Sequence, residues 1–379
     1  MNKEINPFIV TGKIAPEYFC DRVEESKRLV KSLTNGNNMV IISPRRMGKT
    51  GLIQFCYDKP EWKDTYYTFF IDILHTSSLR ELIFLLGKEI FETLLPRSQK
   101  MAMAFMQTLK SINGKFGFDT LTGMPSFNLQ LGDIDRPEYT LEEIFKALGE
   151  ADKPCIVAID EFQQITKYPE KNTEALLRTH IQKISNSQFI FAGSERHMMQ
   201  AMFMSAAHPF YHSADFMELN AIAEDIYIPF IVEHFTRLDR LIDAENVKKV
   251  YNLFKGHTYY VQKTFNEAFS DTQKGQECTA ETIHDAIDSI IANNATLFRE
   301  ILSNIPEKQK ELLYAIAREG EATQITSAAF IKRHRLSSSS SVQSAANKLL
   351  EKDYITEINK KISVTDKLFA LWINKIYGV

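Results

Sequence analysis

The sequence predicts an α/β fold in which a parallel sheet lies between two layers of helices, followed by a helical part and a small module of helices and a hairpin. The runs at 39–42 and 155–159 are apolar at every position, and the run at 188–192 is apolar after Gln188, as in strands that are buried on both faces. Segments with helical apolar spacing separate these runs, so the strands pair in parallel through helical crossovers. Strand signals stop after about residue 219, which places the sheet in the first part of the chain.

Composition is that of an ordinary globular protein of two or three domains, with 379 residues, 44% hydrophobic and 25% charged. The formal net charge of −3 predicts no overall positive field for nucleic acid, so any such contact must come from a local patch. The four cysteines are scattered without metal-ligand spacing, which predicts buried thiols in a reducing, cytoplasmic location. No apolar stretch approaches the roughly 18 residues of a membrane span, so we expect no membrane contact.

The first predicted domain covers residues 1–220. Alternating apolar and polar residues around Thr122-Gly123 predict a β-hairpin inserted near 115–132, with strands at 116–119 and 126–131. A further strand is expected at 66–71. Helices are expected at 50–57, 78–95, 99–110, 141–148 and 174–184.

The remaining chain divides into a helical lid at 221–300 and a module at 301–379. The lid helices are expected at 223–241, 244–254, 259–269 and 279–294. The module has helices at 307–319, 327–333 and 339–351, then strands at 355–358 and 361–364. Three helices and a hairpin are typical of a winged helix, and the serine run at 337–341 suits a helix N-cap. We expect the apolar residues Leu368, Phe369, Leu371 and Trp372 to pack inside the molecule.

A phosphate-binding loop is predicted between the first strand and the following helix. Backbone N–H groups and a helix N-terminus bind phosphate in such a loop, Lys49 reaches the β/γ oxygens, and the Thr50 hydroxyl ligates Mg²⁺. Ser43 stands where the P-loop motif has its first glycine, and the alternative interpretation is a chance turn that contains Gly-Lys-Thr. The candidate nucleotide-binding residues are Ser43, Pro44, Arg45, Arg46, Met47, Gly48, Lys49, Thr50 and Gly51.

Two later strands end in polar residues that fit the same site. Asp160 and Glu161 follow a buried strand, at the sheet edge where parallel sheets bind ligands. Asp160 would hold the Mg²⁺ water shell and Glu161 would polarise the attacking water. The alternative is a strand-end pair that caps the next turn. Ser194 ends another strand and is a candidate for the γ-phosphate or the water, or else a simple turn former.

These residues resemble the archaeal-type ATPases, a branch of the AAA+-like, STAND-related P-loop proteins with a C-terminal winged helix. The segment Phe19-Cys-Asp21-Arg22-Val-Glu-Glu is similar to the family's N-terminal box, which implies that Asp21 and Arg22 border the adenine. Asp160-Glu161 corresponds to the family's Walker B motif and Gly193-Ser194 to its sensor 1. Gly256-His257-Thr258 is similar to its lid motif, with Thr258 in place of a proline, and implies a nucleotide contact for His257. The resemblance implies ATP and Mg²⁺ as cofactors, with ADP as product.

One position departs from the family pattern. Ser213 follows the Pro209-Phe-Tyr run where the family often has an arginine that senses the γ-phosphate. Because an arginine finger supplies a factor of about 10³–10⁵ in rate, its absence predicts slow turnover. Arg196, Arg237 or an arginine of a partner are alternatives.

The C-terminal module is mildly basic, with twelve Lys/Arg and eight Asp/Glu at 307–379. Phosphate contacts are expected from Lys332, Arg333, His334 and Arg335 and from Lys360-Lys361, and base contacts from Gln343, Ser344 and Asn347. Docking of a protein and packing within the molecule remain as alternatives to DNA.

The sequence therefore predicts an ATP-binding, slowly hydrolysing switch whose nucleotide state acts on the winged helix and, through it, on DNA or a protein partner. A DNA-acting loader or motor related to origin-recognition ATPases is one alternative. A nucleotide-binding regulator without significant hydrolysis is the other, although Glu161 argues against it. The sequence leaves the pathway and the oligomeric state open.

Overall fold

A computed structural model describes residues 5–12, 14–112, 116–118, 125–127 and 130–378. Its internal contacts divide the chain into two units. We call Gly12–Ile222 the sheet unit, and Met1–Thr11 together with Ala223–Val379 the helical unit. Residues 5–11, which the sequence assigned to the first domain, therefore group with the last part of the chain. The predicted boundaries at 220 and 300 stay predictions.

The sheet unit is built on a five-stranded sheet in the order β2-β5-β6-β1-β7, and every pairing in it is parallel. Three of the strands and most of β2 were expected from the sequence, whereas β7, which forms one edge, was not. The strands are β1 (Met39–Ile42), β2 (Tyr67–Asp72), β5 (Cys155–Asp160), β6 (Ser187–Gly193) and β7 (Asp215–Glu218).

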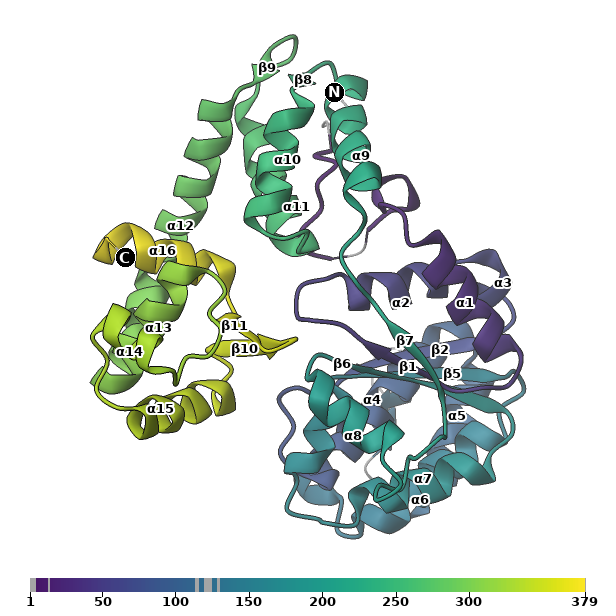
Figure 1. Cartoon of the computed structure of the whole chain (residues 1–379). Helices are drawn as coiled ribbons and strands as arrows, with labels where there is room; N and C mark the ends of the chain where they lie inside the picture. The colour runs from purple at the N-terminus through teal and green to yellow at the C-terminus, as the bar shows by residue number, and fades with distance from the viewer. Residues whose placement is uncertain (1–4, 13, 113–115, 119–124, 128–129, 379) are drawn as a thin grey trace. The chain divides into compact units, whose positions relative to one another are not determined.

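Helices cover both faces of this sheet, which confirms the predicted three-layer α/β fold (Figure 1). Residues of β1 alternate between the two cores: Met39 and Ile41 pack with the first layer, and Val40 and Ile42 with the second. The first layer consists of α1 (Val23–Thr34), α2 (Lys49–Tyr57) and α3 (Pro60–Lys63). The second consists of α4 (Leu79–Arg97), α5 (Gln99–Thr108), α6 (Pro137–Gly149), α7 (Thr173–Lys183) and α8 (Arg196–Met204).

The expected hairpin is present as the antiparallel pair β3 (Phe116–Phe118) and β4 (Pro125–Phe127). Its predicted turn at Thr122-Gly123 lies outside the described residues. Leu131, which the prediction placed in the second strand, instead begins a 3₁₀ turn, Leu131–Asp133, closed by reciprocal hydrogen bonds between Gln130 and Asp133.

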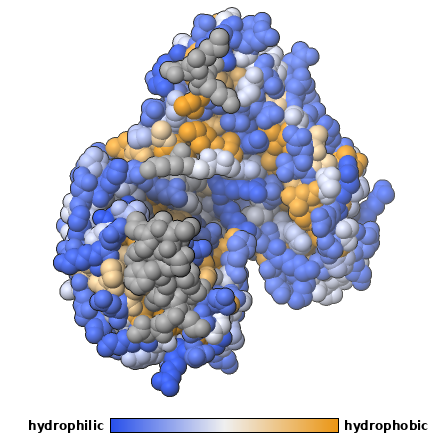
Figure 2. Space-filling model, turned by 180° about the vertical axis from the view of Figure 1, so that it is seen from behind, coloured by the Kyte–Doolittle hydropathy of each residue, from blue (hydrophilic) through white to orange (hydrophobic). Residues whose placement is uncertain are grey.

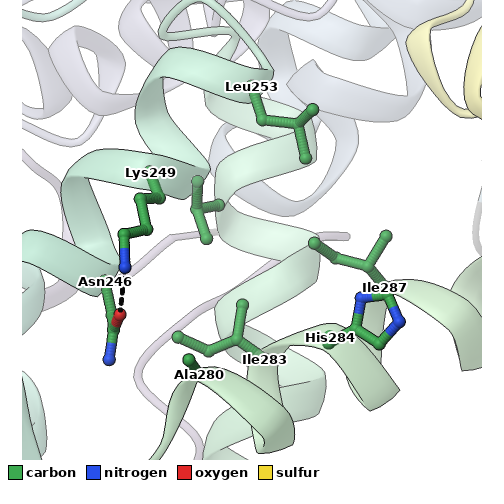
Figure 3. A pocket seen from close by; sticks show the side chains of 8 residues that line it. Asn246, Lys249, Leu253, Ala280, Ile283, His284 and Ile287 are labelled. Atoms are coloured by element: carbon green, nitrogen blue, oxygen red, sulfur yellow. Dashed lines mark hydrogen bonds between the residues drawn. The ribbon is translucent and has the colours of Figure 1, made fainter.

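The first half of the helical unit contains α9 (Glu224–Arg237), α10 (Ala244–Leu253), α11 (Thr258–Asp271) and α12 (Ala280–Ser303). The helix expected at 223–241 ends at Arg237, and Leu241–Ile242 forms a short parallel pair, β8 with β9 (Glu277–Cys278). The aliphatic side chains Leu253, Ile283 and Ile287 line a groove of about 170 Å³ between α10 and α12 (Figure 3).

The first described residues of the chain pack into this helical layer. Phe8 is fully buried, and its ring centroid lies 5.4 Å from that of Phe235, 5.9 Å from Phe265 and 5.8 Å from Phe269. A hydrogen bond to the backbone also holds this segment, because the Asn266 side chain donates to the Phe8 carbonyl at 2.7 Å. Phe8 therefore belongs to the core of the helical unit.

The second half of the helical unit is a winged helix, as predicted. It consists of α13 (Glu307–Glu319), α14 (Ala328–His334), α15 (Ser339–Glu351), β10 (Ile355–Ile358), β11 (Lys361–Val364) and α16 (Lys367–Tyr377). Ser338 of the serine run caps α15 by accepting from the Ser341 N–H. Leu368, Phe369 and Trp372 are buried as expected, and Leu371 is half-buried.

No helix in the described ranges is long and apolar enough to cross a membrane. Figure 2 shows hydrophilic residues over much of one face of the molecule, with hydrophobic residues in separate patches.

Candidate nucleotide-binding site

The loop between β1 and α2 contains two residues with left-handed backbone, Arg46 at φ 68° and Gly48 at φ 88°. Such turns direct successive N–H groups to one side, an arrangement that binds anions. Gly48 is the N-cap of α2, which adds the partial positive charge of a helix N-terminus. The Ser43 N–H donates to the Gly193 carbonyl at 3.2 Å and so ties the loop to the end of β6. The loop thus has the backbone features that phosphate binding requires.

Asp160, the last residue of β5, joins the two functional residues that begin α2. The Thr50 hydroxyl donates to Asp160 Oδ2 at 2.8 Å, and Lys49 Nζ lies 2.8 Å from Asp160 Oδ1. The side chains of Lys49 and Asp160 are only 8% and 7% exposed, so their charges interact away from bulk water. Residues separated by 110 positions therefore meet at one point, as the strand-end argument required.

Glu161 follows directly and extends this cluster. Lys49 Nζ donates to Glu161 Oε1 at 3.1 Å, and the Ser194 hydroxyl donates to Oε2 at 2.6 Å. The Arg45 Nε–H in turn reaches Ser194 Oγ at 3.5 Å. Glu161 has left-handed backbone, φ 56° and ψ 41°, an unfavourable conformation for a residue with a Cβ. Its surroundings hold the carboxylate in this position.

The charge state of Glu161 follows from two opposing effects. Burial would raise the pKa of its carboxyl group. The positive charge of Lys49, together with hydrogen bonds from Ser194, Gln163 and Lys49, lowers it, and the net pKa lies below the ordinary value. Glu161 is therefore ionised at neutral pH.

Mg²⁺ fits the oxygen ligands at this point. It prefers oxygen ligands, keeps several waters, and is commonly held by one or two protein groups plus phosphate oxygens. The Thr50 hydroxyl and the Asp160 carboxylate are such a pair. Within the residues that the structure describes, no cluster of three or more His, Cys, Asp or Glu side chains forms an all-protein metal site.

Arg22 supports the loop from the N-terminal side. Its buried guanidinium donates to the Asn220 carbonyl at 2.6 Å and to the Met47 carbonyl at 3.4 Å, and it pairs with Glu25 at 2.8 Å. Asp21 and Arg22 both have positive φ, so the chain reverses sharply before α1 begins. Arg22 thus positions the loop backbone, and the predicted adenine contacts of both residues stay predictions.

Two residues near these motifs were not singled out from the sequence. Phe55 of α2 stacks on Phe19 with ring centroids 4.1 Å apart and an interplanar angle of 4°. Gln163 donates to Glu161 Oε2 at 2.6 Å. The sequence 160–164 contains this glutamine, but no residue pattern predicts the turn that directs its side chain back to the Glu161 carboxylate.

The candidates for a missing arginine differ in their surroundings. Arg196 pairs with Glu218 at 2.7 Å, and the Ser213 hydroxyl donates to the Phe210 carbonyl within its own turn. Arg237 and His257 belong to the helical unit, where His257 is the N-cap of α11. A nucleotide contact for either of these two stays a prediction. None of the residues that line the groove in Figure 3 is a predicted nucleotide-binding residue.

The basic residues of the winged helix have acidic neighbours. Arg333 and His334 share Glu319, at 2.6 and 2.7 Å, and Lys361 pairs with Glu321 at 3.0 Å. Lys332, Arg335 and Lys360 are exposed. On α15, Gln343 donates to Asn347 at 3.0 Å, and both side chains are exposed with Ser344. The residues expected to contact bases therefore share one polar, accessible face.

Solved structures show the same overall fold at low sequence identity. The Walker-type ATPase PABY2304 of Pyrococcus abyssi is 18% identical with a TM-score of 0.67, over 97% of this chain and 99% of that one. The Aeropyrum pernix ORC2 protein, in ADPNP-ADP complexes, is 12% identical with a TM-score of 0.60, over 100% and 99%. The Aeropyrum pernix ORC1 protein in complex with DNA is 11% identical with a TM-score of 0.53, over 98% and 97%.

No curated protein sequence matches the chain significantly. The family described as a probable winged helix domain matches residues 296–375, which contain the winged helix seen in the structure. The family described as an ATPase domain predominantly from Archaea matches residues 19–264. This match covers well over half of the chain and includes the phosphate loop, Asp160-Glu161 and Ser194. The chain therefore belongs to this family of P-loop ATPase domains, found predominantly in Archaea, and adds a C-terminal winged helix to it.

Proposed function

We propose that this chain binds Mg·ATP at the β1–α2 loop, hydrolyses it slowly, and uses the nucleotide state to control its winged helix. The observation that carries the proposal is the convergence of Lys49, Thr50, Asp160, Glu161 and Ser194 at the carboxyl ends of β5 and β6. Each supplies a group that phosphoryl transfer to water uses: cation, metal ligands, base and polar hydroxyl. Membership of the ATPase-domain family supports ATP as the bound nucleotide. A structural neighbour that was solved in ADPNP-ADP complexes supports it as well.

The proposed roles require two exchanges of partner. The Lys49 ammonium leaves the carboxylates of Asp160 and Glu161 for the β/γ-phosphate oxygens. The Ser194 hydroxyl leaves Glu161 for the γ-phosphate or the attacking water. Thr50 and Asp160 would hold Mg²⁺, which supplies charge neutralisation at the phosphates when bound. Glu161, ionised at neutral pH, then accepts the proton of the attacking water.

Slow turnover follows from the arginine candidates. Ser213 is uncharged, and its hydroxyl donates to the Phe210 carbonyl. Arg196, which also belongs to the sheet unit, forms an ion pair with Glu218. In these contacts, neither Ser213 nor Arg196 therefore supplies a positive charge to the γ-phosphate. We propose that hydrolysis remains slow until an arginine, from this chain or from a partner, reaches the γ-phosphate.

For the partner of the winged helix, we favour DNA over protein. The exposed face of α15 consists of amide and hydroxyl side chains, which suit base edges, and a structural neighbour was solved in complex with DNA. A salt-dependent DNA-binding assay in the ATP and ADP states tests this choice. Absence of salt-sensitive binding at low ionic strength in both states would favour a protein partner.

The enzymatic part is tested by measuring ATP binding and phosphate release for the wild type and Glu161→Gln. Binding in both proteins with release only in the wild type supports the proposal. Glu61→Gln, an exposed substitution on α3, is the matched control and should behave as wild type. Wild-type protein that binds ATP without hydrolysing it would instead favour a nucleotide-binding regulator.

A further inference from the structure

Gln163 is buried directly behind the proposed general base. Its side chain is 1% exposed and lies in the 3₁₀ turn Phe162–Lys167 that follows Glu161. Its Nε2–H donates to Glu161 Oε2 at 2.6 Å, a short hydrogen bond to an ionised acceptor. Hydrogen bonds to charged acceptors are shorter and stronger than neutral ones.

The amide oxygen of Gln163 is in a different situation from its N–H. Gln163 Oε1 is buried and has no hydrogen-bond partner in the described part of the chain. An unsatisfied buried carbonyl destabilises a fold, and an aliphatic side chain of similar size would avoid that penalty. Rotating the amide by 180° would place Oε1 against the Glu161 carboxylate, which is worse. In Gln163, therefore, the N–H that faces Glu161 has a hydrogen-bond partner and the amide oxygen has none.

Gly193 provides the space that this arrangement needs. A Cβ built on Gly193 would lie 2.5 Å from Gln163 Oε1 and 2.6 Å from Met199 Cγ. Only a residue without a side chain can therefore occupy the end of β6 while Gln163 stays in place. The same residue precedes Ser194, and the Gln163 amide and the Ser194 hydroxyl both donate to Glu161 Oε2.

The three donors to Glu161 differ in what they would do when ATP binds. Under the proposed function, Lys49 leaves Oε1 and Ser194 leaves Oε2, because both turn to the nucleotide. We propose that Gln163 is a positioning residue that alone keeps the Glu161 carboxylate in place during hydrolysis, an inference that rests on the proposed function. In this step the water oxygen bonds to the γ-phosphorus while the bond from that phosphorus to the β–γ bridging oxygen breaks. Glu161 takes the water proton, and ADP and phosphate result.

Gln163→Met tests the inference, because methionine has a similar volume without the N–H donor. We expect kcat to fall about tenfold with the Kd for ATP within about twofold of wild type. The ascending limb of the kcat–pH profile should move to higher pH, because the carboxylate loses a hydrogen bond that favours its ionised form. Gln164→Met is the matched control, since the Gln164 amide donates instead to the Thr76 carbonyl at 2.9 Å.

A double substitution separates positioning from a structural role. In a Glu161→Gln background, Gln163→Met should produce no further loss of rate, because the group that it positions is already absent. A full additional loss would mean that Gln163 acts through the fold and would overturn the inference. Gln163→Asn provides a second single variant that retains an amide but is one carbon shorter, and it should show the same lower kcat.

The two proposals fail in different ways. Hydrolysis by the wild type that depends on Glu161 supports the proposed function whatever Gln163 does. Unchanged kcat and an unchanged pH profile in Gln163→Met and Gln163→Asn would then overturn the positioning role alone. A wild-type protein whose hydrolysis is unaffected by Glu161→Gln would overturn both.

Discussion

The nucleotide site and the winged helix both place cations beside carboxylates, but in different environments. Lys49 contacts Asp160 and Glu161 with all three side chains at most 12% exposed. Arg333, by contrast, is 64% exposed where it meets Glu319. Exposed ion pairs contribute about 0–1 kcal/mol, whereas removing one member of a buried pair costs about 3–5 kcal/mol. Similar distances therefore mean a large cost for an unpaired charge in the nucleotide site and a small cost in the winged helix.

Lys49→Ala should have the largest effect, because it removes the cation from two buried carboxylates. We expect no detectable ATP binding by calorimetry and a decrease in the free energy of unfolding on the order of 3 kcal/mol. Lys63→Ala, an exposed substitution on α3, is the control and should change neither quantity. Wild-type ATP affinity in Lys49→Ala would show that the phosphate loop has been misassigned.

Substitutions of the two carboxylates should separate binding from chemistry. Glu161→Gln is expected to lower phosphate release by about 10²–10⁴-fold while ATP binding changes little, because the general base is lost. Asp160→Asn should weaken the dependence of ATP binding on Mg²⁺, because it removes charge beside Thr50. The reverse pattern, with binding lost only in Glu161→Gln, would mean that the two roles are exchanged.

The free energy of unfolding should depend on the ionisation of Glu161 at acidic pH. The pKa of Glu161 in the folded protein is lower than its ordinary value of 4.5, the net result of burial opposed by Lys49 and the hydrogen bonds. Its stabilising contribution is therefore complete above 4.5 and is lost as pH falls through the lower, folded-state pKa. Denaturant titrations should show the wild type losing stability relative to Glu161→Gln over this range. A constant difference at all pH values would contradict the assigned shift.

The exposed cations should give the smallest effects, seen in the salt dependence of DNA binding. Lys332→Gln and Arg335→Gln should each lower the slope of log K against log[salt] by about 0.9 if those residues contact phosphate. Glu319→Gln should strengthen DNA binding slightly, because it releases Arg333 from its ion pair. Basal ATP hydrolysis should be unchanged in all three variants. If Glu319→Gln leaves DNA binding unchanged, Arg333 does not contribute to the surface.

The buried strands were predictable from the sequence because each contains a run of apolar residues, and β5 and β6 are followed by the polar residues of the site. Strand β7 was missed, since Asp215 and Glu218 at its ends hide a short strand with only two apolar residues. Helix α1 was missed for a different reason: its N-cap, Arg22, has left-handed backbone and makes no side-chain cap hydrogen bond, so the helix has no N-terminal signal. Two-residue strands such as β8 are too short to show any periodicity.

Within the site, residue type and strand-end position predicted the meeting of Lys49, Thr50, Asp160 and Glu161. The contacts of Arg22 and Gln163 could not be predicted in this way. Arg22 reaches Asn220, which lies 198 positions away, and Gln163 depends on the left-handed turn at Glu161. Both arise from backbone conformations that no pattern of residue types specifies.

The burial of Phe8 has a consequence for the order in which the protein is made on the ribosome. Its ring partners Phe265 and Phe269 are translated more than 250 residues later, after the whole sheet unit. At about 5–20 residues per second, this side chain waits on the order of ten to fifty seconds for its core. The sheet unit can therefore complete its fold first, while an apolar segment ahead of it stays exposed to chaperones. A fragment that begins at Ala223 would never receive that side chain and would contain a cavity the size of a phenylalanine.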